Sequence, residues 1–75
     1  MSIQVKLFAS LRDRIGISDV SIDSAATAGE AWDIATNNAD RPSNVLVAIN
    51  LDYAKFESPV QDGDEVAFFP PVTGG

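Results

Sequence analysis

The sequence predicts a single α+β domain, residues 1–75, in which one main helix packs on one face of a small mixed sheet. Segments that alternate apolar and polar residues, as half-buried strands do, lie on both sides of one helical segment. A length of 75 residues suits one domain, and 45% of them are hydrophobic. Because the chain has no Cys, this apolar core must hold the fold without a disulfide.

The first part of the chain predicts two strands and a short helical turn. Ile3–Leu7 alternates as a half-buried strand does, and Phe8 breaks that phase and points to the other face. Ser10–Gly16 is typical of about one helical turn closed by glycine. Asp19–Asp23 alternates again, so we expect it to pair with the first strand.

A capping box predicts the main helix. We expect the Thr27 hydroxyl to accept from the Glu30 amide and the Glu30 carboxylate to accept from the Thr27 amide. The helix is expected to run to about Asn38. Trp32, its one large apolar residue, is interpreted as a core residue rather than a binding residue. The expected apolar face is Ala28, Ala31, Trp32 and Ala35, with Ile34 at its margin.

The second half predicts three more strands. Val45–Ile49 is a continuous apolar run, which favours a strand that is covered on part of both faces. A turn at Asn50–Asp52 leads to a short return strand, Tyr53–Lys55, and Glu65–Phe69 forms the last strand. With the first and last strands side by side in the middle, the order corresponds to a β-grasp arrangement.

Composition excludes several classes of function. With no His and no Cys, the chain lacks the commonest general base, a thiol nucleophile and the best zinc ligands. A net charge of −6 provides no basic stripe for nucleic acid, and suits either positively charged partners or solubility alone. No apolar run approaches the roughly 18 residues of a membrane span, and no signal peptide opens the chain, so we expect a cytoplasmic protein without a membrane partner.

No internal group of residues predicts catalysis or metal binding. Asp62, Asp64 and Glu65 lie close together around Gly63, but the spacing and flanking helices of an EF-hand calcium loop are missing. The pattern favours a turn with solvated acids. No Ser has a nearby His or other base, and no glycine-rich phosphate loop is present.

Three aromatic residues predict a surface for a protein partner. Phe8 and Phe69 each follow a core-facing position, so both should point to the outer face of the sheet, where Tyr53 can join them. The alternative is that the three rings only fill gaps at the sheet edge. Arg12 or Arg14 lies beside this patch as a charged contact, and the residues alone do not choose between them.

The last residues, 69–75, predict a flexible extended tail. They show no periodicity, two prolines stiffen the exit from the last strand, and two glycines precede the terminal carboxylate. Such an end suits insertion into a narrow slot, whereas the simpler alternative is a frayed terminus. The residues that follow Phe69 are Pro70, Pro71, Val72, Thr73, Gly74 and Gly75.

The segment Asp62–Gly75, with sequence DGDEVAFFPPVTGG, resembles the C-terminus of the small subunit of molybdopterin synthase, the MoaD family. The resemblance continues in Val47–Asn50 and Val5–Ala9, with Arg12 and Gly16, and the helical region matches in pattern more than in residues. Members of that family are ubiquitin-like β-grasp domains, which agrees with the predicted element order.

The resemblance implies a sulfur carrier with no catalytic site of its own and no bound cofactor or metal. An E1-like adenylyltransferase of the MoeB type is expected to use ATP to adenylate Gly75, and a sulfur donor protein to convert it to a thiocarboxylate. The tail, with Gly74, then enters a large subunit of the MoaE type and gives sulfur to the pterin precursor. The implied docking positions are Phe8, Tyr53, Phe69 and Arg12.

Three other functions remain open at this point. A sulfur carrier for thiamine thiazole synthesis, of the ThiS family, shares the fold and the final Gly-Gly, although its chains are usually shorter and lack Phe-Phe-Pro-Pro-Val. A protein modifier would join targets through Gly75. A plain structural subunit would use the tail only as an anchor.

Overall fold

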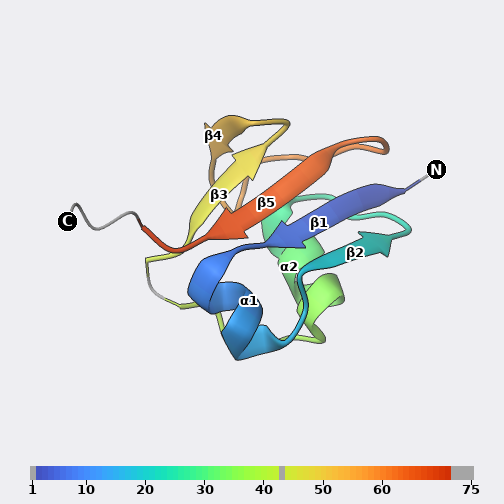
Figure 1. The fold of residues 1–75 in the computed structure, drawn as a ribbon. Coiled ribbons are helices and arrows are strands. Elements are labelled where there is room, and N and C mark those ends of the chain that lie inside the picture. Colours follow the sequence, from blue (N-terminus) through green and yellow to red (C-terminus); the bar gives the residue numbers. More distant parts are fainter. Residues whose placement is uncertain (1, 43, 72–75) are drawn as a thin grey trace.

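The computed structural model describes residues 2–42 and 44–71 and consists of a five-stranded mixed sheet with helices packed against it (Figure 1). The elements are β1 (Ile3–Leu7), α1 (Ala9–Ile15), β2 (Asp19–Ile22), α2 (Ala28–Thr36), β3 (Leu46–Ile49), β4 (Asp52–Ala54) and β5 (Glu65–Phe69). The expected α+β class is confirmed. Within the described ranges, neither helix has the length and apolar character needed to cross a membrane.

The strand order is β2-β1-β5-β3-β4, with β1 and β5 in parallel at its centre (Figure 1). In that pair Val5 lies opposite Val66 and Leu7 opposite Phe68. The other three pairs of neighbouring strands are antiparallel. The predicted pairing of the first and last strands is therefore confirmed, as is the β-grasp arrangement. The Phe8 N–H donates to the Phe68 carbonyl at 3.1 Å, which extends the pairing to the end where the tail begins.

Strands β1 and β5 have the predicted ends, whereas β2, β3 and β4 differ from their predicted ends by one residue. The clearest case is Asp52, which was predicted to lie in a turn but pairs with Ile49 as the first residue of β4. Asn50 and Leu51 both have positive φ, so two residues are enough to close the hairpin. The return strand therefore starts one residue earlier than predicted and ends at Ala54.

Helix α2 begins at the predicted capping residue, but the predicted hydrogen-bond partner of the Glu30 carboxylate was wrong. The Thr27 hydroxyl accepts from the Glu30 N–H at 3.2 Å, but the Glu30 carboxylate accepts from the Ala26 N–H at 3.1 Å and not from Thr27. An antiparallel bridge between Thr27 and Pro59 sets how the chain enters the helix, and it leaves the Ala26 N–H facing Glu30. The helix ends at Thr36 rather than near Asn38, because the two asparagines after it adopt left-handed conformations.

Replacing Thr27 by Ala is expected to remove the side-chain cap and lower the stability of the domain by about 1 kcal/mol. For a domain of this size, that corresponds to a fall in Tm of about 4–8 °C. Thermal unfolding followed by circular dichroism measures the change. Thr27→Ser keeps the hydroxyl and is the matched control, so an equal fall in both variants would contradict the capping role.

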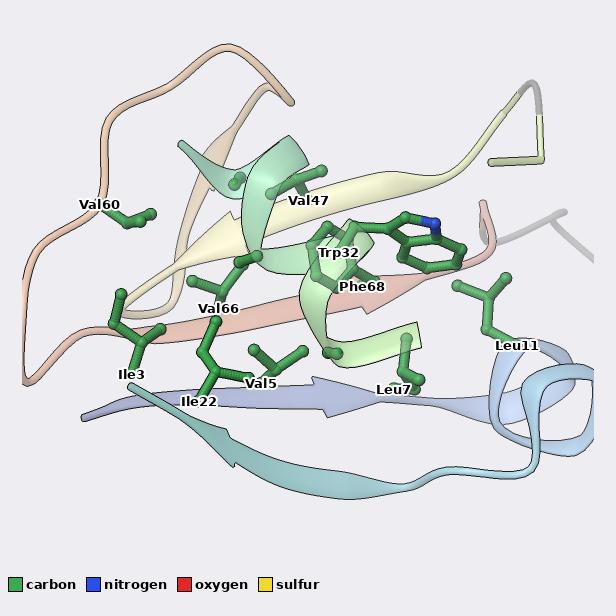
Figure 2. Packing of buried hydrophobic residues seen from close by; sticks show 13 residues of the cluster. Ile3, Val5, Leu7, Leu11, Ile22, Trp32, Val47, Val60, Val66 and Phe68 are labelled. Carbon is green, nitrogen blue, oxygen red and sulfur yellow. The ribbon is translucent and has the colours of Figure 1, made fainter. Parts of the chain in front are cut away.

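Trp32 is fully buried between α2 and the sheet, which confirms its prediction as a core residue (Figure 2). Its ring lies 5.1 Å from that of Phe68, edge to face, and its Nε1 donates to the Ala39 carbonyl at 2.9 Å. The Phe56 ring stacks on the Phe68 ring at 5.6 Å, and the Arg41 guanidinium lies over the Phe56 ring, 4.7 Å from its centre. The predicted apolar residues of the helix are all buried, whereas Ile34 is 50% exposed.

Candidate functional site

The outer face of the sheet, opposite α2, has an apolar half formed by β5, β3 and β4. Phe69 follows the buried Phe68 and lies opposite Leu46, while Ala67 lies opposite Ala48. Because side chains alternate between the two faces of a strand, these residues share the face that the core does not use. We call this surface the docking face; its residues are Phe8, Leu46, Ala48, Tyr53, Ala67 and Phe69.

The structure brings two of the three predicted aromatic residues into contact. The rings of Tyr53 and Phe69 lie 6.1 Å apart with a tilt of 46°. Tyr53 is 79% exposed and Phe8 is 46% exposed. Phe8 directly follows β1, the strand next to that of Phe69, and among the described residues its ring forms no aromatic pair with either of the other two. These exposed rings do not contribute to the buried core, and a group of exposed apolar residues is typical of an interaction surface.

Sequence reasoning missed three residues of the docking face, namely Leu46, Ala48 and Ala67. The continuous apolar run of β3 indicated cover on both faces but did not reveal its partner on the outer side. Register supplies that information, because Ala48 lies between Ala67 of β5 and Tyr53 of β4. One signal in the sequence could have revealed them. The positions of β3 and β5 that alternate with the core positions are mostly apolar, whereas a face exposed to solvent would be polar.

Polar side chains form the other half of the outer face and limit the docking face on that side. The Lys6 ammonium lies 3.6 Å from the Glu65 carboxylate. Gln4 donates to the Asp19 carboxylate and accepts from the Ser21 hydroxyl at 2.9 Å. Since these partners lie on β1, β2 and β5, the boundary between the two halves runs along the middle of the sheet.

Arg12 and Arg14 both lie in the last turn of α1, beyond the end of β1. The Arg12 Nε lies 4.0 Å from the Asp13 carboxylate, and its side chain is 54% exposed. An exposed pair between neighbours in sequence holds a guanidinium weakly. Arg12 is thus free to contact a partner, and its docking role stays a prediction.

The acids around Gly63 form a turn, as the sequence indicated. Asp64 accepts from the Asn50 amide at 2.9 Å and from the Gln61 N–H at 2.8 Å. These two hydrogen bonds, that from Asn50 first, lower the pKa of Asp64 below its usual value of 3.8. Across the ranges that the structure describes, no group of three acidic side chains is arranged to hold a metal ion.

Asp64→Asn is expected to cost stability at neutral pH and to cost progressively less as the solution becomes acidic. Because the folded-state pKa is lowered, the stabilising contribution of Asp64 is complete above 3.8 and is lost as the pH falls through the folded-state value. Urea midpoints of both proteins, measured from neutral pH down to about pH 2.5, show whether the two curves converge. A difference that stays constant with pH would contradict this account.

The tail leaves the sheet directly from the docking face. Pro70 and Pro71 follow Phe69 and are half-buried at the end of the sheet where β1 leads into α1 (Figure 1). Neither proline can donate to a sheet, so they end β5 and direct the chain outward. The remaining predicted tail residues, Val72, Thr73, Gly74 and Gly75, lie outside the described residues.

A family model described as the ThiS family matches residues 5–75. The chain belongs to the ThiS family. A relative from Haemophilus influenzae, named molybdopterin synthase sulfur carrier subunit, is 39% identical over 97% of this chain and 99% of its own length. The resemblance seen in the sequence is thereby confirmed, and this relative carries the molybdopterin name rather than that of the thiamine pathway.

Two solved structures are similar to this member of the ThiS family. SAMP1 from Haloferax volcanii matches with a TM-score of 0.80 and 30% identity over all of both chains. A chain in the complex of subunits 1 and 2 of the molybdopterin-converting factor from Helicobacter pylori matches with a TM-score of 0.69, and the match covers 100% of each chain. At 24% identity, the second likeness shows the fold alone.

Proposed function

We propose that this member of the ThiS family is the sulfur carrier of molybdopterin synthesis and donates sulfur from a thiocarboxylate on Gly75. The observation that carries the proposal is the near full-length relative, 39% identical, that is named as the sulfur carrier subunit of molybdopterin synthase. The match of the family model as far as residue 75 includes the whole Pro-Pro-Val-Thr-Gly-Gly tail.

The tail chemistry follows from the reactivity of a carboxylate. A free carboxylate resists substitution because its oxygen is a poor leaving group. Transfer of AMP from ATP to Gly75 releases pyrophosphate and forms an acyl-adenylate. Hydrosulfide that attacks the carbonyl carbon displaces AMP and leaves a thiocarboxylate directly. A persulfide on the sulfur donor protein displaces AMP to give an acyl disulfide, and a thiol of the donor then attacks the donor's own sulfur, forming a disulfide on the donor and releasing the thiocarboxylate. Because the chain has no Cys, this sulfur must come from another protein.

The proposed partners divide this work between them. An E1-like adenylyltransferase supplies the ATP chemistry, a sulfur donor protein supplies the sulfur, and a large synthase subunit receives the tail. The Haemophilus influenzae relative is named as a subunit of molybdopterin synthase, which supports an assembly with a further subunit. The docking face supports it too, since Tyr53 and Phe69 present apolar rings beside the exit of the tail.

Mass spectrometry of the intact protein tests the proposal. After incubation with the adenylyltransferase, ATP and a sulfur source, the chain is expected to gain the mass difference between sulfur and oxygen, located on the C-terminal peptide. Omission of ATP should prevent the gain. An unchanged mass under conditions that load another sulfur carrier would overturn the proposal.

A second candidate function is protein modification, and one observation favours it. The structure of SAMP1, a small archaeal modifier protein, matches this chain over its whole length at 30% identity. A modifier would form an isopeptide bond between the Gly75 carbonyl and a target lysine, with loss of AMP. A western blot separates the two functions, because only a modifier gives high-mass conjugates that disappear when Gly75 is deleted.

A further inference from the structure

Leu51 combines high exposure with an unfavourable backbone conformation. It is the second residue of the two-residue turn between β3 and β4, and 87% of it is exposed. Its φ is +73°, next to a φ of +52° at Asn50. Hairpin turns with two positive φ angles favour Asn followed by Gly, because a side chain at the second position is crowded. The turn therefore has Leu where Gly is the less strained choice.

Neighbouring groups hold this turn in place. The Asn50 N–H donates to the Glu65 carbonyl at 2.8 Å, and the Glu65 N–H donates to Asn50 Oδ1 at 3.0 Å. Asn50 also donates from its amide to Asp64 at 2.9 Å. The hairpin tip is thus tied to the start of β5, and this leaves the Leu51 side chain directed into solvent. Leu51 adds strain and almost no packing, which points to a role outside the fold.

We propose that Leu51 is a second docking contact, which inserts into an apolar hollow on the large synthase subunit that covers the docking face. This inference rests on the proposed function. The same hairpin carries Tyr53, whose ring packs against Phe69, so Leu51 lies in the turn two residues before a residue of the docking face. The docking face beside the exit of the tail is the surface proposed for the large subunit, so a contact that continues this face is assigned to the same partner.

The position of Leu51 explains what a second contact does. Leu46 pairs with Phe69 at the end where the tail leaves, whereas Ile49 pairs with Val66 toward the other end. With about 3.3 Å for each residue of a strand, the turn lies roughly 13 Å from the level of Phe69. Two contacts that far apart prevent the domain from rotating on its partner. They therefore fix the direction in which the tail points.

Leu51→Gly is expected to change stability and binding in opposite directions. Relief of the positive φ raises Tm by about 4 °C, whereas loss of the side chain weakens binding to the large subunit about tenfold. Calorimetry with the purified large subunit of the same organism measures binding, and thermal unfolding measures Tm. Leu51→Met keeps an apolar side chain and should retain the affinity of the wild type.

Ile34→Ser is the matched control, since Ile34 is also an exposed apolar residue but lies on α2, away from the docking face. It should bind as the wild type does. Unchanged affinity of Leu51→Gly, or a fall in its Tm, would overturn the inference. If Phe69→Asp binds weakly while Leu51→Gly binds normally, only this inference fails; if both bind normally, the docking face of the proposed function fails as well.

Discussion

Gly74→Val and deletion of Gly75 are each expected to abolish thiocarboxylate formation while the domain folds normally. Folding should not change, because the buried core lies between Ile3 and Phe68. A β-branched side chain next to the reacting group widens the chain and restricts φ, so the end no longer passes through a narrow channel. Intact mass spectrometry after incubation with the adenylyltransferase, ATP and a sulfur source measures the loss.

Thr73→Ser is the matched tail variant, since it changes one methyl group and should load like the wild type. An alanine appended after Gly75 moves the carboxylate by one residue without altering any internal position, and we expect it to block loading. Circular dichroism spectra of all the variants should superimpose. Sulfur on the Gly75 deletion variant would show that the reacting carboxylate has been assigned wrongly.

Phe69→Asp is expected to weaken binding to the large subunit by about 100-fold or more. The change removes the ring that packs against Tyr53 at 6.1 Å and places a carboxylate in the middle of the docking face. A charge buried at an apolar interface without a partner loses its hydration and gains nothing in return. Isothermal calorimetry gives the affinity, and the circular dichroism spectrum should stay close to that of the wild type because Phe69 is only partly buried.

Glu65→Gln is the control for this prediction, because it lies on the same strand but on the polar half of the outer face. It breaks the exposed pair with Lys6 at 3.6 Å, which should change affinity little. Phe69→Ala removes the ring without adding charge and should give an intermediate loss. Normal binding of Phe69→Asp would show that the aromatic residues only fill gaps at the sheet edge.

Much of the fold was predictable because its signals are local. Alternation in β1 and β5 indicated which side chains face the core, and the glycine after α1 indicated where that helix ends. The capping residue of α2 was equally visible, yet the partner of the Glu30 carboxylate was not. That partner depends on the bridge between Thr27 and Pro59, which joins segments more than thirty positions apart in the sequence.

The docking face was only partly predictable for the same reason. Phe8, Tyr53 and Phe69 were visible as aromatic residues out of phase with the core. Leu46 and Ala48, by contrast, were hidden within an apolar run, since their face depends on the register between β3 and β5. Ala67 was hidden in the same way.

The element order, the core phase of the strands and the residues of the proposed reactive tail can be inferred from the residues alone, because spacing and side-chain chemistry are properties of short segments. The residues also show which chemistries are missing, since no His or Cys occurs in the chain. The folded domain was needed to show which apolar residues share the outer face, and to show that Leu51 is strained and exposed at the hairpin tip. The physical reason is that strand register and turn conformation arise from hydrogen bonds between distant segments, such as those joining Asn50 to Glu65.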